Sequence, residues 1–403
     1  MRDIDRWPVC PLGEIFSISS VAVNPALRPD TVFTHYSLPA FDSHAGPVAQ
    51  AGRDIESQKF LVGAPSVLVS KLNPRIPRVQ IAEHPRGDGC DVASTEFMVY
   101  VPKSNVDVDL RFYKRLFSSG DFSGKLQACA IGTTGSHTRV RPRETLGWKV
   151  PYPPLDEQGR IAEILDALDS RIEDARRAEV KLGKVEVALI SELLSSVTSF
   201  DRLGLVVERV IDGVHHTPAY VESGVPFLTV ENLTRGPGIS FTPCRYISTS
   251  DHRSFIKRVA PRPGDVLVSK DGTLGVARVV PRGAPEFSIF VSVALLRPRM
   301  GRVTSDFLAL FFDSSIFRRQ LAALSSGSGL KHIHLHEMKS FRLPLPPLPD
   351  QEQIVARIRD ARAVRRAGVE ELSKLKLIRE GLTQDLMTGR VRVSEAEAVL
   401  ENL

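Results

Sequence analysis

The chain has 403 residues, which at roughly 150 residues per domain suggests two or three domains. Its 42% hydrophobic and 25% charged residues are ordinary for a globular protein and argue against a disordered or fibrous chain. No run of about 18 apolar residues occurs and the start resembles no signal peptide, so we expect a cytoplasmic protein with no membrane partner. Four widely separated cysteines support neither a disulfide framework nor a cysteine zinc site.

The net charge of +6 is unevenly distributed along the chain. Residues 1–155 carry +3 and residues 198–349 carry +7, whereas the segments between and after them sum to −4. Two basic segments separated by non-basic ones fit a polyanion that is bound at two places. Ordinary solvated surface charge explains the same count, so charge alone does not decide between the two.

An internal repeat sets the predicted organisation. The sequence PPLDEQ at residues 153–158 returns as PPLPDQ at residues 346–351, an offset of 193. Upstream, VLVSK at 67–71 returns at 266–270, and Leu12-Gly13 returns as Leu203-Gly204. Such similar offsets indicate a duplicated unit, and a period near 195 residues is far too long for a solenoid. We therefore predict two pseudo-equivalent halves.

Each half begins with about 150 residues that are rich in proline, glycine and short β-branched runs. These runs predict strands at 60–62, 67–69, 97–101, 266–268, 276–280 and 287–296, with helices at 110–118 and 305–324. The predicted class is α+β, with two mixed α/β domains and an internal pseudo-two-fold repeat.

Each half ends in one long predicted helix with a heptad seam of about 35 residues. The apolar seam positions are Ile161, Leu165, Leu168, Ile172, Leu182, Leu189 and Leu193 in the first helix, and Ile354, Ile358, Leu372, Leu375, Leu382 and Leu386 in the second. The polar exceptions are acidic in the first helix (Glu179, Glu186) and basic in the second (Arg365, Arg379), which favours pairing between the two helices. A solitary amphipathic helix is the alternative for either segment alone.

If the two helices pair antiparallel, they form a coiled-coil-like rod of roughly 50–60 Å with a globular domain at each end. The predicted organisation is a domain at 1–152, a central long helix at 153–197, a second domain at 198–345, a second long helix at 346–390, and a tail at 391–403.

No catalytic motif was found in the sequence. It lacks a G-x-x-x-x-G-K-[ST] phosphate loop, a G-x-G-x-x-G after a strand, and an Asn-Pro-Pro-Tyr-type tetrapeptide that would hold a flipped base. The serines and histidines form no nucleophile elbow. We therefore expect a chain that is not an enzyme by itself.

Two basic loops occupy equivalent places in the halves. The first carries Lys71, Asn73, Arg75 and Arg78, and its counterpart carries Lys270 and Thr273. Lysine and arginine bind phosphates, whereas arginine, asparagine and aspartate can also contact base edges. The loops differ at the positions that would contact bases while the flanking strands match, which favours two recognition domains with different targets. Taken alone, each loop is more often a solvated hairpin.

Three histidines, His332, His334 and His336, follow one another at period two and would share one face of a strand. A metal site could begin this way, but no further ligand is evident and Lys331 opposes cation binding. Arg139 and Arg141 stand at the places of His332 and His334 in the first half. We interpret this face as a nucleic-acid contact with no metal, and a plain exposed loop is the alternative.

Several motifs together resemble a known family. They are the two PPLx[ED]Q helix starts, LTQDLMTGR at 382–390, LVSKLNPR at 68–75, DVLVSKDGT at 265–273, and DGVHHTP at 212–218, which adds His215 and His216 to the candidate DNA-binding residues. In this order, and over nearly the whole chain, they resemble the DNA-specificity subunit of type I restriction–modification systems.

The resemblance implies a non-catalytic subunit whose two target-recognition domains bind the halves of a bipartite site in double-stranded DNA. It also implies two modification (methyltransferase) subunits that carry S-adenosylmethionine, and restriction (translocase/endonuclease) subunits that use ATP and Mg. We expect no cofactor on this chain itself. The alternatives, in order, are a stand-alone DNA-binding regulator with two DNA-binding domains, a protein-only scaffold, and a methyltransferase or nuclease with cryptic motifs.

Overall fold

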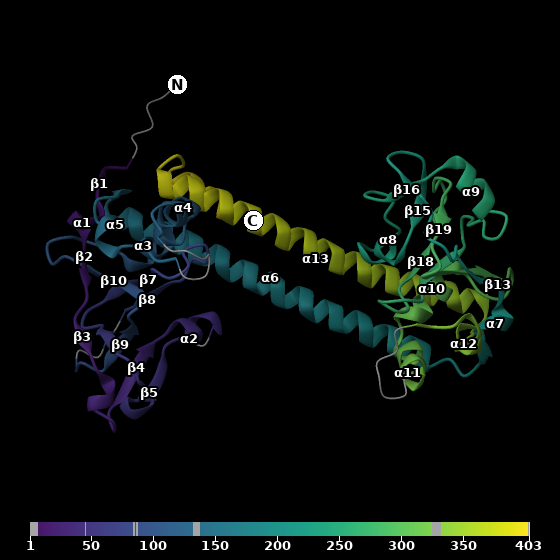
Figure 1. Ribbon diagram of the computed structural model, residues 1–403, viewed down its shortest axis with the longest axis horizontal. Helices are drawn as coiled ribbons and strands as arrows, with labels where there is room; N and C mark the ends of the chain where they lie inside the picture. Colours follow the sequence, from purple (N-terminus) through teal and green to yellow (C-terminus); the bar gives the residue numbers. More distant parts are fainter. Residues whose placement is uncertain are drawn as a thin grey trace. The chain divides into compact units, whose positions relative to one another are not determined.

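The chain divides into two compact units in a computed structural model, which describes residues 7–44, 46–83, 85, 88–131, 138–324, 332–401 and 403. Unit 1 comprises residues 1–175 and 371–403, and unit 2 comprises residues 176–370. Each unit therefore contains one globular domain and one part of each long helix (Figure 1).

Unit 1 is built on three sheets and several short helices. Its strands are β1 (Val9–Pro11), β2 (Phe16–Ser19), β3 (Ala22–Val23), β4 (Val32–Tyr36), β5 (Val48–Ala51), β6 (Lys59–Leu61), β7 (Ser66–Ser70), β8 (Val79–Ala82), β9 (Asp91–Ser94), β10 (Phe97–Pro102) and β11 (Lys149–Pro151). They form a four-stranded antiparallel sheet β2-β10-β7-β8, a five-stranded sheet β3-β6-β9-β4-β5 and a ladder β1-β11. The helices are α1 (Leu12–Ile15), α2 (Leu38–Asp42), α3 (Leu110–Phe117), α4 (Gly120–Ala128) and α5 (Pro142–Thr145), with 3-10 turns η1 (Pro25–Leu27) and η2 (Gly52–Asp54).

Unit 2 repeats much of this arrangement. Its strands are β12 (Phe200–Arg202), β13 (Val207–Asp212), β14 (Tyr220–Val221), β15 (Val225–Leu228), β16 (Arg245–Ile247), β17 (Val266–Ser269), β18 (Ala277–Val279), β19 (Ser288–Ile289), β20 (Val293–Pro298) and β21 (Arg342–Pro344). They form the sheets β13-β20-β17-β18 and β14-β16-β15-β19 and the ladder β12-β21. The helices are α7 (Leu203–Val206), α8 (Val230–Thr234), α9 (Thr249–Phe255), α10 (Ser305–Asp313), α11 (Ser315–Ala323) and α12 (Leu335–Ser340).

The sheet orders confirm the predicted internal repeat. The four-stranded sheet β2-β10-β7-β8 of unit 1 has the same connectivity as β13-β20-β17-β18 of unit 2, and the ladder β1-β11 corresponds to β12-β21. The units differ in their other sheet, which has five strands in unit 1 and four in unit 2. The predicted helix at 305–324 is wrong in one respect, because it is two helices that meet at Ser314. The Ser314 hydroxyl accepts a 3.1 Å hydrogen bond from the Phe317 N–H and so caps α11.

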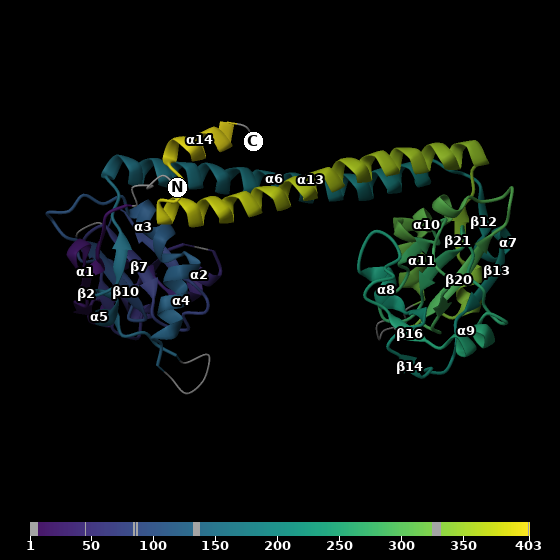
Figure 2. The same ribbon diagram turned by 90° about the horizontal axis from the view of Figure 1, so that it is seen from above.

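The two long helices are α6 (Leu155–Ser195) and α13 (Leu348–Thr388), and they run side by side in both views (Figures 1 and 2). In unit 2, Glu179 lies 3.1 Å from Arg365, and Glu186 lies 2.8 Å from Arg362. Because the residue numbers rise along α6 while they fall along α13, the helices are antiparallel, as predicted. In unit 1, Arg379 pairs with Asp169 at 3.1 Å. The acidic and basic exceptions in the seam therefore do pair between the helices.

The predicted seam residues differ in burial along the two helices. The buried ones are Ile161, Leu165, Leu168, Ile354, Ile358, Leu375, Leu382 and Leu386, and the half-buried ones are Ile172, Leu182, Leu189, Leu193 and Leu372. All of the buried ones except Leu375 belong to the apolar clusters of the two globular domains. A Cβ at Gly368 would lie 3.8 Å from the Leu182 Cδ1, so these two residues are neighbours across the seam.

A buried glutamine explains the repeated helix-start motif. The Gln158 side chain accepts a 2.9 Å hydrogen bond from the Asp109 N–H and donates one of 2.9 Å to the Pro153 carbonyl. In unit 2, Gln351 does the same with the Thr304 N–H and the Pro346 carbonyl, again at 2.9 Å. Asp109 and Thr304 are the N-caps of α3 and α10. The motif thus fixes the start of each long helix to one helix of the adjoining domain.

Residues 391–403, which the sequence suggests only as a tail, contain a further helix, α14 (Val393–Glu401). Val393 and Ala396 are buried in the same apolar cluster as Leu386, and Figure 2 shows α14 beside the start of α6. Trp7 joins this cluster, and its indole N–H donates a 3.0 Å hydrogen bond to the Leu386 carbonyl. Unit 1 is therefore assembled from segments that lie more than 370 positions apart in the sequence.

In the described part of the chain, no helix has both the length and the apolarity needed to cross a membrane.

Candidate nucleic-acid interface

The two predicted loops begin at equivalent backbone positions, after β7 and after β17. The Lys71 N–H donates to the Glu96 carbonyl and the Lys270 N–H donates to the Ser292 carbonyl, both at 2.9 Å. The carbonyls of the two lysines accept from the N–H groups of Val140 and Ile333, at 3.0 and 2.8 Å. Each loop is thus held between the same two neighbouring segments.

The same register places the predicted arginines and histidines opposite one another in the repeat. Leu72 forms an isolated antiparallel bridge with Arg139, and Asp271 forms one with His332. Arg139 and His332 therefore occupy equivalent positions next to the two loops. The scaffold is shared, while the side chains that it presents differ.

The unit 1 loop presents one exposed cation and one half-buried cation. Lys71 is half-buried, with its ammonium 5.9 Å from the centre of the Phe60 ring. Asn73 adopts a positive φ of 47°, and its carbonyl accepts the Ile76 N–H at 3.1 Å, which makes a tight turn. Arg75 at this turn is exposed, and among the described residues no ion pair involves it. It is the side chain of this loop that is most available to an anion.

The other predicted arginines of unit 1 are held in ion pairs. Arg78 pairs with Asp42 of α2 at 2.7 Å with only 12% of its side chain exposed, and this hydrogen bond lowers the pKa of Asp42. Arg78 therefore anchors α2 through Asp42 and is not available to contact DNA. Arg139 forms a two-pronged contact with Glu96 at 2.9 Å but stays 51% exposed, and Arg141 pairs with Glu144 at 3.3 Å. Both remain accessible enough to exchange a carboxylate for a phosphate.

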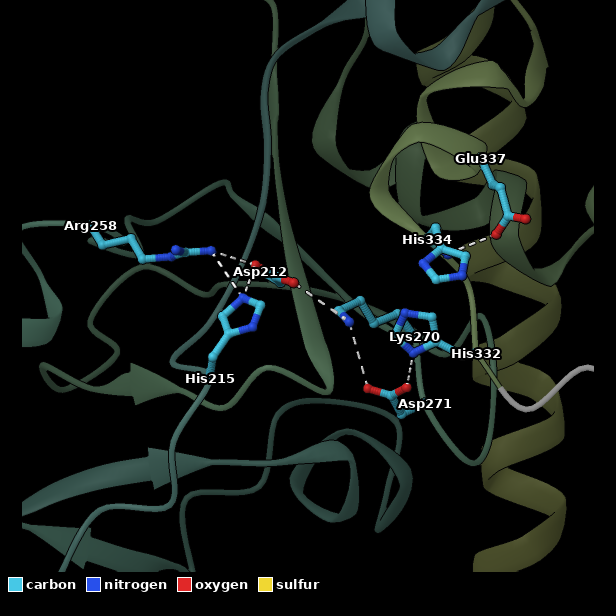
Figure 3. A network of polar contacts seen from close by, with 8 residues as sticks. All are labelled: Asp212, His215, Arg258, Lys270, Asp271, His332, His334 and Glu337. Carbon is cyan, nitrogen blue, oxygen red and sulfur yellow. Dashed lines mark hydrogen bonds and ion pairs between the residues drawn. The ribbon is translucent and has the colours of Figure 1, made fainter.

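Lys270 requires a correction, because the sequence predicts a DNA contact and the side chain is only 2% exposed. Its ammonium lies 3.5 Å from a carboxylate oxygen of Asp212 and 3.6 Å from one of Asp271 (Figure 3). A buried cation needs such neutralising partners, since an unpaired charge in the interior is costly. Lys270 therefore positions the carboxylate of Asp271 in the loop, and does not reach a phosphate itself.

Asp212 lies at the centre of this network and is only 5% exposed. Burial by itself would raise its pKa, but hydrogen bonds from His215 at 3.1 Å and Arg258 at 2.8 Å outweigh burial. With the nearby charge of Lys270, they hold the pKa of Asp212 below its ordinary value. The carboxylate is therefore ionised and joins β13 to the loop after β17.

The three histidines do not share a strand face, so that prediction is wrong. Only His332 makes a β-bridge, and its Nδ1 hydrogen-bonds the Asp271 carboxylate. His334 caps α12, because its N–H donates to a Glu337 carboxylate oxygen at 2.7 Å, and His336 lies inside that helix. Their rings nevertheless follow one another, with centres 4.6 and 5.5 Å apart. Across the ranges that the structure describes, no three His, Cys, Asp or Glu side chains converge as in a metal site.

The remaining predicted residues of unit 2 lie nearby. His215 is exposed and contacts Asp212, while the exposed His216 packs edge-on against Phe255 with ring centres 5.4 Å apart. Thr273 is exposed at the turn of the loop. Gly275 follows in this loop at φ +79°. A side chain does not fit at this position, because a Cβ there would fall 2.3 Å from the Phe317 ring. Lys331 lies outside the described residues.

The acidic partners of the interface were not predicted as site residues. They are Glu96, Asp212 and Asp271. The basic side chain of Arg258, which pairs with Asp212, was not predicted either. Two of the acids stand inside the motifs DGVHHTP and SKDGT, so a signal was present in the sequence. Carboxylates repel phosphates, so acidic residues are not obvious candidates for a DNA-binding surface. Their roles as acceptors for base amino groups or as partners of basic side chains depend on tertiary contacts.

A family model described as the type I restriction modification DNA specificity domain matches residues 76–182 and 220–364. The chain belongs to this family. The two matched segments fall one in each half of the repeat and together cover more than half of the chain. The resemblance noted in the sequence is therefore confirmed.

Known relatives agree with this assignment. The specificity subunit of the type I restriction enzyme MjaVIII from Methanocaldococcus jannaschii is 24% identical over 334 residues, which cover 75% of each chain. The EcoBI specificity subunit from Escherichia coli is 22% identical over 320 residues, which cover 71% of this chain and 67% of the relative.

Solved structures share the fold. The HsdS subunit from Thermoanaerobacter tengcongensis superposes with a TM-score of 0.60 at 22% identity, over 96% of this chain and 97% of its own. A chain from a structure titled for complex assembly and conformational transition of the type I R-M system gives a TM-score of 0.69 at 22% identity, over 96% of this chain and 99% of its own. The predicted fold class is thus confirmed over nearly the full chain.

Proposed function

We propose that this chain is the DNA-specificity subunit of a type I restriction–modification complex, and that each unit recognises one half of a bipartite duplex site. The observation that carries the proposal is the pair of loops after β7 and β17, which share backbone contacts but not side chains. A shared scaffold with different presented groups is what recognition of two different half-sites needs. The family match in both halves supports it.

The two units offer different chemistry to DNA. Unit 1 presents guanidinium groups, Arg75, Arg139 and Arg141, which bind phosphates and pair with guanine edges. Unit 2 presents imidazoles and a carboxylate, among them His215, His332 and Asp271, and carboxylates accept hydrogen bonds from the cytosine amino group. We therefore expect the two half-sites to differ in sequence.

The proposal includes partners that carry the chemistry. Two modification subunits would supply methyl transfer with S-adenosylmethionine, and restriction subunits would use ATP and Mg for translocation and cleavage. This chain would contribute recognition without a catalytic step or a cofactor of its own, in a cytoplasmic complex. The names of its relatives as specificity subunits of type I restriction enzymes support this division of labour.

Methylome sequencing tests the proposal directly. A host that carries this gene with its modification subunits should methylate a bipartite motif with a fixed gap, and deletion of the gene alone should remove that methylation. Exchange of residues 198–345 for the matching region of a relative should change one half-site and leave the other intact. Unchanged methylation after deletion would contradict the proposal.

A further inference from the structure

In unit 1 an ion-pair network joins the globular domain to both long helices. Arg115 of α3 pairs with Asp169 of α6, and the Asp169 carboxylate also accepts a 3.1 Å hydrogen bond from Arg379 of α13. Arg115 pairs in addition with Asp166, three positions earlier on α6, at 2.5 Å. Only 12% of the Arg115 side chain is exposed, so these charges are weakly screened. The signs are positive on the domain, negative on α6 and positive on α13.

Unit 2 has a network of the same kind with every sign reversed. Asp313 of α10 pairs with Arg362 of α13 at 2.6 Å, and Arg362 pairs with Glu186 of α6 at 2.8 Å. Glu186 is 12% exposed and also pairs with Arg365 at 3.2 Å. The nearby guanidinium group of Arg278 donates to two backbone carbonyls instead. The signs are negative on the domain, positive on α13 and negative on α6.

The internal repeat shows that these two networks occupy equivalent places on the helices. The offset of 193 that relates the two helix starts maps the helix members of one network onto the helix members of the other. It also maps the second partner of Arg115 onto an exposed arginine of α13. The corresponding pairs are Asp169 with Arg362, Glu186 with Arg379, and Asp166 with Arg359. In each pair one residue is acidic and the other is basic.

The domain members of the two networks come from equivalent helices. The N-caps of α3 and α10 are Asp109 and Thr304, which the two buried glutamines contact in the same way. Arg115 lies six residues after the first cap, and Asp313 lies nine residues after the second. Because residues three apart share a helix face, both side chains project from the same face of their domain helix.

Each domain therefore matches one long helix and mismatches the other. If the first domain lay against α13, Arg115 would meet Arg359 and Arg362 in place of two carboxylates. If the second domain lay against α6, Asp313 would meet Asp169. Such like-charge contacts are costly in a partly buried place, since an uncompensated charge there destabilises the protein.

We propose that these networks assign each recognition domain to one of the two long helices, an inference that rests on the proposed function. Arg115 and Asp313 are then positioning residues, which act through the helix that each of them holds. The order of the two half-sites in the target is thus determined partly by charges that lie outside the recognition loops. A recognition domain can change its place in the chain only if its charged residue changes with it.

A domain transplant in the full-length chain tests this assignment. The plain transplant replaces residues 198–345 by a second copy of residues 7–152, which directs Arg115 of the copy at the arginines of α13. The adapted transplant also carries Arg115→Leu and Ser118→Asp in the copy, which supplies the leucine and the aspartate that α10 has at these places. The reciprocal variant carries the same two substitutions in the first domain of the otherwise wild-type chain.

Methylome sequencing of hosts that carry each chain with the modification subunits is the readout. The adapted transplant should methylate a motif with the first half-site at both ends, at least about tenfold more completely than the plain transplant. The reciprocal variant should methylate the natural motif at least about tenfold less completely than the wild type. Substitutions that merely change the stability of the domain would act in the same direction in both places.

Both transplants keep the natural first domain, so their binding to a duplex with the first half-site alone checks that they are folded. Equal methylation by the two transplants, or failure of both although they are folded, would overturn the inference and leave the proposed function intact. Wild-type methylation by the reciprocal variant would overturn it as well. A wild-type chain that directs no bipartite methylation would instead overturn the proposed function.

Discussion

The backbone N–H of Asp109 donates a 2.9 Å hydrogen bond to the side-chain oxygen of Gln158, at the start of the first long helix. The side-chain NH2 of Gln158 also donates a hydrogen bond to the Pro153 carbonyl, so this one buried side chain satisfies two backbone groups from different elements. The arrangement recurs around Gln351 in unit 2. These hydrogen bonds attach the start of each long helix to the adjoining domain.

Replacement of Gln158 or Gln351 by alanine should therefore destabilise the protein by about 1–3 kcal/mol, since buried backbone groups lose their partners. The measurement is the urea midpoint of unfolding. Glu352→Ala, at the exposed neighbour of Gln351, should shift stability by no more than about 0.5 kcal/mol. If the glutamine variants match this control, the glutamines do not hold the junction.

The buried Asp212 predicts a pH dependence of stability. Its pKa is lowered in the folded protein, so its contribution is present at neutral pH and is lost as the pH falls below about 4. Asp212→Asn should cost about 3 kcal/mol at pH 7, because Lys270 and Arg258 lose a buried counter-charge. That difference from the wild type should shrink steadily in unfolding curves recorded toward pH 3.

Asp360→Asn serves as the control for this series, because Asp360 is exposed on α13. Its small effect should not vary over the same pH range. A constant difference between the wild type and Asp212→Asn would show that the carboxylate charge is not what Asp212 contributes.

The repeat and the long paired helices could be predicted because they are periodic or duplicated, and such patterns survive in a single sequence. The α14 helix could not, since it has only a short apolar pattern, and its buried residues Val393 and Ala396 share a cluster with residues such as Ile161 and Leu165, more than 200 positions earlier. The histidine stretch misled for a related reason. Its alternation fits a strand, but a hydrogen bond to the Glu337 carboxylate starts a helix at Leu335.

Local sequence also fails to set the burial of the two loop lysines. Both follow the same VLVS strand, yet Lys71 is half-buried and Lys270 is 2% exposed. The difference comes from Asp212, which supplies a buried carboxylate at the unit 2 position. Whether a lysine of this motif faces solvent thus depends on a residue about 60 positions away.

Simultaneous replacement of Lys71 and Arg75 by alanine should weaken binding to the first half-site only. Each phosphate contact contributes about 0.9 to the slope of log K against log salt, so the slope should fall by about one to two. Anisotropy titrations over a salt series, on duplexes that carry one intact half-site each, measure both effects. Lys103→Ala, beyond the opposite end of β10, should leave affinity and slope unchanged. Equal weakening at both half-sites would contradict independent recognition by the two units.

The paired helices should set the gap between the half-sites. Because Leu182 lies beside Gly368, four residues inserted after Leu182 require four more after Gly368 to keep the helices in register. This pair of insertions adds about one turn, or 6 Å, and should widen the methylated motif by one or two base pairs. Both half-site sequences should stay the same.

Insertion after Leu182 alone is the informative comparison. It should separate Glu186 from Arg362 and lower stability, because only one helix is lengthened. If the paired insertions change a half-site sequence, or leave the gap as it was, the helices do not determine the spacing.

The hydrogen bond from the Trp7 indole to the Leu386 carbonyl has a consequence for the order in which the two units fold during translation. Unit 2 is continuous in sequence, so it can fold as soon as residue 370 has emerged, since domains generally fold as units during translation. Unit 1 must wait for residues 371–403 although most of it is made first. Until then Ile161 and Leu165 lack part of their apolar cover, so the nascent chain exposes apolar side chains there. The half of the protein that is translated first is therefore the half that is finished last.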